Sequence, residues 1–536
     1  MHRRFISGVA ATALLLVAGS AVAQDFSAQR LSDEIRTISA DDFQGRYPGT
    51  DGEKKTLDWL QAQYEAMGMA PGGPNGQWLQ VVDLKRYTPV ADAAKASWTG
   101  ADGQVHVLTP GTDLTLRAVS NDGKASITDA GLVFAGYGIN APERGWDDYG
   151  DLDVTGKIVL VVGGEPDGDL FNGPYTTNYQ SGAYKADEAK RRGALGVITV
   201  SKAAATDAAW TRMVQGNART RTLTPGAADL EFSGAINADT AKALGLDMAD
   251  LTARVGSGDF RAFVMPGVTL SVETAETTDT LRTHNLLARI PGTKRPNETI
   301  IYSAHWDHVG VNEHAAGDDK VFNGAWDNAS GTIGVLEMAR QLKAAPAPDR
   351  TIVFAHMAAE EMGLLGAYAY AADPVYPLET TVADINIDML PLSGPTRDVP
   401  IFGKGQNSLE DDLQALAVKE GRYVSDDGQP EQGFYYRSDH FPFARAGVPA
   451  LMPWHGVDWV DGGKEAGLAA WKARFAADYH KPSDEWSADW DLRSAVENLT
   501  LLYRLGLQLA NSDEWPTWKP TSEFGQVRAA SDAARR

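Results

Sequence analysis

The spacing of apolar residues changes along the chain and predicts different elements in different stretches. Between residues 28 and 70 apolar side chains recur every three or four positions, which predicts amphipathic helices. Residues 77–118 are typical of irregular strands. From residue 284 onward short apolar runs alternate with helical patterns, which predicts a mainly parallel sheet sandwiched by helices. The predicted strands are 284–290, 299–303, 351–357, 382–387 and 399–402, and the predicted helices are 331–343, 363–372 and 409–420.

The middle of the chain has a different composition, rich in Gly, Ala and Val. It predicts strands at 131–136, 156–162 and 193–200 and a helix at 183–192. Residues 273–282 have the polar composition of a linker, so we expect them to separate this block from the part that follows. The chain becomes polar again after Asn511, and we expect its last residues to be loose.

Composition excludes several classes of function. The chain has 536 residues, which is too long for one ordinary domain. It has no cysteine, so disulfide scaffolds, cysteine nucleophiles, thiolate zinc sites and iron–sulfur clusters are excluded. The formal charge is −22, and such a chain repels phosphate backbones and anionic lipid. We therefore expect neither nucleic acid nor a membrane surface as a partner.

The amino terminus has the pattern of a cleaved signal peptide over residues 1–23. A short basic start is followed by an uncharged apolar run from Ile6 to Ala18, and Ala21 to Ala23 supplies small residues before the cleavage point. The apolar run is short for a membrane span, which disfavours an uncleaved anchor. We expect export to the periplasm or out of the cell, and no membrane contact after cleavage.

Five short stretches concentrate the residue types that bind metal ions. Three of them directly follow a predicted strand, and the carboxyl ends of parallel strands meet at one edge of a sheet, where ligands bind. We therefore expect residues far apart in the sequence to converge there. The stretches are 304–308, 324–331, 359–363, 386–389 and 479–484, and their candidate ligands are His305, Asp327, Glu361, Asp388 and His480.

Taken singly, each stretch has an ordinary structural interpretation. Glu360 and Glu361 could be a solvated pair, His305 a hydrogen-bonded core residue, and Asp327 part of a helix cap. Asp388 is harder to explain in this way, because an unpaired carboxylate in an apolar strand is costly. Imidazole and carboxylate ligands without thiolate suit zinc, and five ligands suit two ions that share one carboxylate.

In their order and spacing, these motifs resemble a known family. The set His-x-Asp, Asp-Asn-Ala-Ser-Gly, Glu-Glu-x-Gly-Leu-x-Gly, Asp-Met and a late His is similar to the two-zinc aminopeptidases of the bacterial leucyl aminopeptidase and aminopeptidase Y type. Glutamate carboxypeptidase and the transferrin receptor share that fold. The resemblance implies an α/β zinc-exopeptidase domain, hydrolysis of peptides as substrates, and two Zn²⁺ per chain. The stretch 437–443 adds to it.

The resemblance also implies a role for each matching residue. His305 and Asp388 would bind one zinc ion, Glu361 and His480 the other, and Asp327 would bridge both. Glu360 would be the general base, and Asp307 would orient His305 without touching metal. Trp326 departs from the family, which commonly has a small or acidic residue there; we expect this to remove no ligand, although it could reshape the cleft. We leave His308 without a metal role and keep it as the first reserve.

The block in the middle is similar to the β-rich, α+β protease-associated domain that is often inserted in these enzymes. We therefore expect two catalytic segments, an inserted domain and a tail. The short interval between Asp388 and His480 leaves little room for the dimerisation domain of the other common two-zinc plan. The expected boundaries are 24–118 and 280–512 for the catalytic segments, 119–279 for the inserted domain, and 513–536 for the tail.

The most direct interpretation of the sequence is a zinc aminopeptidase, with other functions left open. Tyr435 or Tyr436 is the candidate donor to the oxyanion of the reaction, although either could simply pack in the core. Alternatives on the same fold are a glutaminyl cyclase-like acyltransferase and a dipeptide carboxypeptidase. A non-enzymatic binding protein would be expected to have a degraded site, and a phosphoesterase a more basic one. The sequence fixes neither side-chain preference nor oligomeric state.

Overall fold

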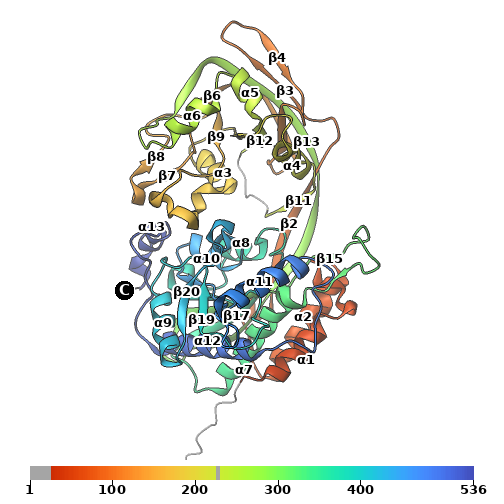
Figure 1. Cartoon of the computed structure of the whole chain (residues 1–536), viewed down its shortest axis with the longest axis vertical. Coiled ribbons are helices and arrows are strands. Elements are labelled where there is room, and N and C mark those ends of the chain that lie inside the picture. The colour runs from red at the N-terminus through yellow and green to blue at the C-terminus, as the bar shows by residue number, and fades with distance from the viewer. Residues whose placement is uncertain (1–25, 225–229, 536) are drawn as a thin grey trace, which may run out of the picture.

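The computed structural model describes residues 26–224 and 230–535, and the chain forms two lobes, one above the other in Figure 1. The predicted signal peptide at 1–23 lies outside the described residues. The lower lobe contains the helices near both ends of the described chain, and the upper lobe contains the middle of the sequence. In the part of the chain that the structure covers, no helix combines the length and apolarity needed to cross a bilayer.

The lower lobe is built on a sheet of the predicted α/β kind. Its strands lie in the order β21-β18-β14-β17-β13, and the first four pair in parallel. The last strand, β13, is antiparallel to β17, so the sheet is mixed at that edge. The strands are β21 (Ala450–Leu451), β18 (Thr381–Asn386), β14 (Arg295–His305), β17 (Arg350–Met357) and β13 (Phe263–Ile290).

Helices cover both faces of this sheet, as the apolar pattern predicted. Alternate residues of each strand enter different cores: Ile300 and Ile352 pack with one cluster, and Ile301 and Val353 with the other. The first cluster includes side chains of α1, α2, α7 and α12, and the second includes those of α8 and α10. These helices are α1 (Ala28–Ile38), α2 (Asp51–Ala66), α7 (Gly331–Ala344), α8 (Leu365–Ala372), α10 (His440–Arg445) and α12 (Arg493–Asn511).

The strand predicted at 399–402 forms outside the main sheet. It corresponds to β19 (Asp398–Ile401), which pairs in parallel with β20 (Tyr423–Asp426). The helix between them is α9 (Leu409–Lys419), close to its predicted range, and α11 (Gly463–Asp478) lies nearby along the chain before His480. This small sheet therefore adds a separate wall beside the carboxyl ends of the main strands.

The expected linker at 273–282 is instead the middle of β13, a single strand of 28 residues that runs through both lobes. Residues 276–286 of β13 pair with β2 (Leu79–Pro89), so that Asp279 faces Arg86 and Arg282 faces Asp83. The polar composition that suggested a linker arises because residues 277–280 in the middle of this strand are exposed to solvent. The expectation of a linker was therefore wrong.

The upper lobe is a second, β-rich layer that continues the same hydrogen-bonded ladder. Its strands lie in the order β13-β6-β9-β10-β12-β5, and α3 (Gly182–Arg191) packs against β10. Because β5 and β3 pair here and not in the lower lobe, strand pairing favours a first domain boundary near residue 90 over one at 118. The boundaries themselves remain predictions. The strands are β3 (Lys95–Thr99), β4 (Val105–Leu108), β5 (Leu114–Ala118), β6 (Lys124–Phe134), β9 (Ile158–Val162), β10 (Gly196–Val200) and β12 (Phe232–Ile236).

The residues after Asn511 are not loose, contrary to the expectation from their polarity. The indole of Trp518 donates to the carbonyl of Gly447, and Phe524 is buried. Arg528, which precedes the end of α13 (Gly525–Ala529), donates to the carbonyl of Thr381 at 2.8 Å. A few large side chains thus fix a segment whose average composition is that of a solvated tail.

Candidate metal centre

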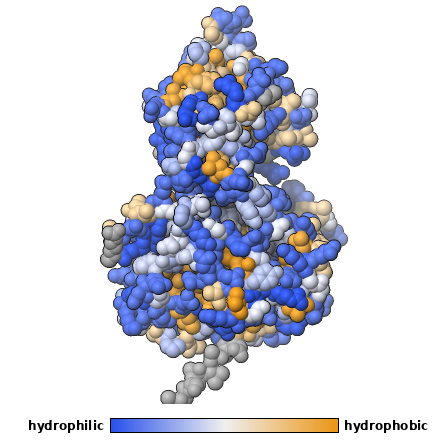
Figure 2. Space-filling view, turned by 60° about the vertical axis from the view of Figure 1, so that its left-hand side comes forward, coloured by the Kyte–Doolittle hydropathy of each residue, from blue (hydrophilic) through white to orange (hydrophobic). Residues whose placement is uncertain are grey.

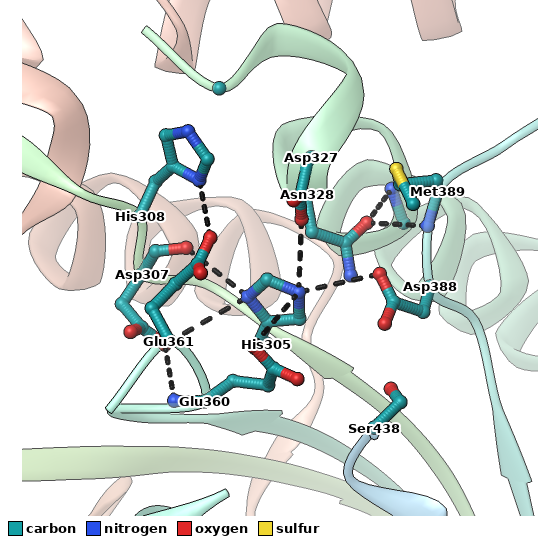
Figure 3. Close-up of polar contacts among 12 residues, drawn as sticks. His305, Asp307, His308, Asp327, Asn328, Glu360, Glu361, Asp388, Met389 and Ser438 are labelled. Atoms are coloured by element: carbon teal, nitrogen blue, oxygen red, sulfur yellow. Dashed lines mark hydrogen bonds and ion pairs between the residues drawn. The ribbon is translucent and has the colours of Figure 1, made fainter. Parts of the chain in front are cut away.

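The predicted ligands converge at the carboxyl ends of three neighbouring parallel strands (Figure 3). His305 is the last residue of β14, Glu360 and Glu361 follow β17, and Asp388 follows β18. Asp327 comes from the turn that precedes α7. The strand-end topology that the sequence predicted therefore brings these side chains together.

The first group of side chains surrounds one nitrogen of His305. Its Nε2 lies 3.3 Å from Asp327 Oδ1 and 3.3 Å from Asp388 Oδ1. All three residues are buried, and their ligand atoms lie within 4.8 Å of one another. One imidazole and two carboxylates thus face a common point.

A second group uses the other oxygen of Asp327. His480 Nε2 lies 3.1 Å from Asp327 Oδ2 and 2.9 Å from Glu361 Oε2. His308, which the sequence left in reserve, also contacts this group, because its Nδ1 lies 2.6 Å from Glu361 Oε1. Asp327 therefore offers one oxygen to each group, as a bridging ligand must.

The remaining two acidic residues contact His305 from other sides. The Nδ1 of His305 lies 3.2 Å from the carbonyl oxygen of Asp307 and 3.9 Å from its Oδ1. The same Oδ1 accepts a hydrogen bond of 3.1 Å from the backbone N–H of Glu360. Glu360 Oε2 lies 4.0 Å from His305 Nε2. Asp307 thus contacts the side of the imidazole that faces away from the first group and also holds the backbone of Glu360.

A carboxylate and an amide that lie within the predicted stretches, but to which the sequence analysis assigned no metal role, hold the turn around Asp327. Asp484 Oδ1 accepts from the backbone N–H of Trp326 at 2.8 Å, and its Oδ2 accepts from that of Asp327 at 2.9 Å. The side chain of Asn328 accepts from the backbone N–H of Met389 at 2.9 Å and donates to the carbonyl of Ile387 at 3.2 Å. These bonds fix the Asp327 turn against the loops that carry His480 and Asp388.

A buried arginine holds two of the loops from behind. The guanidinium of Arg46 is fully buried and donates to the carbonyls of Trp306, Asn323 and Gly324. Burial lowers its pKa to about 10, so it stays charged at neutral pH. Its distance in sequence from the histidine motif left no pattern from which this role could be predicted.

The electrostatics of the site reflect crowding of opposite charges in a buried place. Burial opposes protonation of His305, but Glu360 and Asp388 outweigh it and raise the pKa of the imidazole. Burial raises the pKa of Asp307 to about 7 and holds that of Glu360 well above its ordinary value. For Asp327, hydrogen bonds from both histidines outweigh burial and lower the pKa. Burial would raise the pKa of Glu361, but attraction to His308 and hydrogen bonds from His308 and His480 outweigh it and lower the pKa to about 2.

The donor set fits a pair of divalent ions. Buried carboxylates repel one another unless cations lie between them, and this site gathers four of them with three imidazoles. Two polar atoms at the site, Asp307 Oδ2 and His308 Nε2, are buried and have no hydrogen-bond partner among the described residues. Nitrogen and oxygen donors without thiolate suit zinc. The side chains in question are Asp327, Glu360, Glu361 and Asp388 with His305, His308 and His480.

A cavity opens onto this cluster, but the predicted oxyanion donors do not line it. Tyr436 instead donates its hydroxyl to the carbonyl of Thr176 in the upper lobe, and Tyr435 is buried with its hydroxyl unpartnered in the described chain. Tyr479 and Arg437 line the cavity in their place, together with apolar side chains. Both tyrosines therefore lie near the site in the sequence, but neither side chain lines the cavity that opens onto the metal ligands.

Trp326 does not reshape the cleft. It is 1% exposed, donates its indole N–H to the carbonyl of Leu390, and packs against His455. The bulky residue therefore fills the core behind the Asp327 turn.

Two parts of the chain match known protein families. Residues 285–503 match peptidase family M28, and residues 124–230 match the PA domain. The chain is 24% identical over 370 residues to the Mycobacterium tuberculosis protein named "Probable lipoprotein aminopeptidase LpqL", covering 66% of this chain and 62% of that one. It is 26% identical over 448 residues to leucine aminopeptidase 2 of Arthroderma otae, covering 81% and 74%. Among solved structures, an aminopeptidase from Aneurinibacillus sp. strain AM-1 aligns with a TM-score of 0.47 at 20% identity, over 92% of this chain and 97% of that one.

Proposed function

We propose that the chain is a zinc-dependent aminopeptidase that removes the N-terminal residue of peptides, because residues 285–503 match peptidase family M28 and residues 124–230 match the PA domain. The observation that carries the proposal is the pair of histidine–carboxylate groups that share Asp327. The aminopeptidase names of the two relatives support the choice among peptidase activities.

The ligand assignment follows the two groups. His305 and Asp388 would hold one zinc ion, Glu361 and His480 the other, and Asp327 would hold both. His308 is a further candidate on the second side, since it contacts Glu361. Zinc supplies Lewis acidity and a water molecule with a lowered pKa.

Glu360 is the proposed general base. Its side chain lines the cavity, and burial raises its pKa toward neutral pH. A general base works best when its pKa lies near the pH at which the enzyme acts. It would take a proton from the attacking water and deliver it to the departing amine. Asp307 would keep His305 oriented from its Nδ1 side and hold the backbone of Glu360 in place.

We also propose that the protein is exported to the periplasm or out of the cell. The basis is the pattern of residues 1–23, which combines a basic start, an apolar run and a small-residue cleavage site. Fractionation of expressing cells, with amino-terminal sequencing of the recovered protein, would test it. A chain that keeps Met1 and remains with the cytosol would contradict it.

The activity itself can be tested with three substrate types on zinc-loaded protein. We expect hydrolysis of aminoacyl-nitroanilides, loss of activity with a chelator, and recovery with zinc. N-acylated dipeptides test the carboxypeptidase direction, and peptides with N-terminal glutamine test cyclisation. Turnover of only one of these last two types, or full activity in protein shown by elemental analysis to be metal-free, would refute the proposal.

A further inference from the structure

A second cavity adjoins the metal centre and plays no part in the assignment above. It has a volume of about 490 Å³, within the range of small-molecule sites. Trp454 lines both this cavity and the one that opens onto the metal ligands, so the two share a wall. Other walls come from β20, from Leu468 and Trp471 of α11, and from Tyr175 of the upper lobe. We call it the side cavity.

Two tryptophans in the wall of the side cavity have hydrogen-bond donors that lack acceptors. The indole N–H groups of Trp454 and Trp471 are buried and have no partner among the described residues. Trp454 is 6% exposed. A buried donor without a partner costs about 1–3 kcal/mol, so a ligand that offers an acceptor there is favoured.

The charged residues of the side cavity leave one cation and one carboxylate without an ion-pair partner. Lys404 forms an ion pair with Asp426 at 2.6 Å, but Lys464 and Asp427 form none with any described residue. Asp427 instead accepts the backbone N–H of Gln429 at 2.7 Å. Aromatic and aliphatic side chains make up much of the remaining wall, including Phe402 and Leu468. A ligand that combines an apolar side chain with carbonyl or carboxylate oxygens matches this lining, and a peptide has both.

Both lobes form the side cavity. Tyr175 comes from the upper lobe, and the next residue, Thr176, accepts the hydrogen bond from Tyr436 of the lower lobe. The space-filling view shows the narrow waist where the two lobes meet (Figure 2). A ligand in the side cavity would therefore touch both lobes.

We propose that the side cavity binds the part of a peptide substrate beyond the residue held at the metal centre. The proposal rests on the proposed aminopeptidase function and deepens it, because it names the substrate class: peptides of three or more residues, cleaved in preference to dipeptides. The shared wall at Trp454 places this second site next to the reacting bond. The unpaired indole donors and Lys464 would bind the carbonyl or terminal carboxylate oxygens of the chain.

The test compares chain length in the full protein with two variants. Leu468→Trp would fill the side cavity, and Val418→Trp is its matched control on α9, where Val418 is 60% exposed. We expect wild type to favour a leucyl pentapeptide over leucyl-glycine by roughly tenfold in kcat/KM, the ratio that 1.4 kcal/mol of binding gives. Leu468→Trp should lose most of that preference and Val418→Trp should keep it. Comparing the pentapeptide acid with its amide distinguishes carboxylate from carbonyl recognition.

Two further measurements keep the result decisive. Trp471→Phe keeps an aromatic ring and removes only the N–H, so it should lower the preference even if Leu468→Trp does not fold. Tryptophan fluorescence of the Glu360→Gln protein, titrated with the pentapeptide, reports binding without turnover. If the pentapeptide bound in a way that depends on Leu468 but wild type hydrolysed no peptide, the aminopeptidase proposal would be refuted and the proposal that the side cavity binds peptide would stand. Hydrolysis with no preference for length, or with equal preference in all variants, would overturn the side-cavity proposal.

Discussion

Asp484 gives a sharp test of how the metal centre is held, because it touches the backbone of a ligand and none of the ligand side chains that would carry the metal. Its two oxygens accept the N–H groups of Trp326 and Asp327 at 2.8 and 2.9 Å, and the residue is 2% exposed. Asp484→Asn preserves the shape of the side chain. Its amide, however, offers one acceptor and turns an NH₂ group toward the other backbone N–H.

The magnitude follows from those two bonds. One buried N–H loses its acceptor, which costs about 1–3 kcal/mol of folding free energy. The turn that carries Asp327 then loses its fixed position against the His480 loop. Removing an outer partner of a metal ligand typically lowers metal affinity about 10–100-fold, so we expect Asp484→Asn to weaken zinc binding by that order.

Competition titration with a chromogenic chelator measures the zinc affinity, and thermal unfolding of the metal-free protein measures the change in stability. Asp489→Asn is the matched control, since Asp489 lies five residues along the same loop and is exposed. We expect the control to behave as wild type in both assays. If Asp484→Asn bound zinc as tightly and unfolded at the same temperature as the control, Asp484 would not position Asp327.

Three other perturbations test separate parts of the structure. Glu360→Gln should lower kcat about 10²–10⁴-fold and keep its zinc content, whereas Glu361→Gln should lose zinc as well; elemental analysis with kinetics decides, and the reverse pattern would exchange the two roles. Burial lowers the pKa of Lys185 to about 7, so between pH 7 and 10.5 the unfolded chain binds more protons than the folded chain, and stability should rise with pH in that window. Lys185→Met should flatten this rise when thermal unfolding is measured across the same pH range. An unchanged slope would refute the assignment. Joining Pro89 to Glu276, which pair directly in the ribbon, with a short turn should leave a lower lobe that unfolds cooperatively by circular dichroism, and loss of that transition would show that the upper lobe is part of its core.

The sequence predicted those parts of the site that depend on topology. His305, Glu361 and Asp388 could be placed because each follows an apolar run, and parallel strands end at a common edge. Asp484 and Arg46 could not be placed in the same way. Their contacts are with backbone atoms of distant loops, and such contacts leave no spacing or composition in the sequence.

The orientation of the two tyrosines, on which their predicted role as oxyanion donors depends, could not be predicted for a related reason. Tyr435 and Tyr436 lie next to the motif at 437–443, but from the short helical turn at Phe434–Tyr436 the side chain of Tyr436 points toward the upper lobe, and that of Tyr435 packs against His440 and Phe524. Neighbourhood in sequence predicts which loop a residue is on, whereas the side toward which it points depends on backbone angles within that loop.

The long strand β13 determines how the upper lobe can serve the metal centre. Its exposed ion pairs with β2, such as Arg282 with Asp83, contribute little, because solvent screens them. The backbone ladder of the ribbon and the buried ion pair between Arg117 and Glu276 therefore hold the upper lobe on one side. The bond from Tyr436 to Thr176 holds it on the other side, next to the side cavity. The ion pair between Arg445 and Asp187 and the hydrogen bond from the backbone of Asn178 to Glu523 also join the lobes. These attachments fix the upper lobe better than a flexible linker could, so Tyr175 is positioned to act as a permanent wall of that cavity.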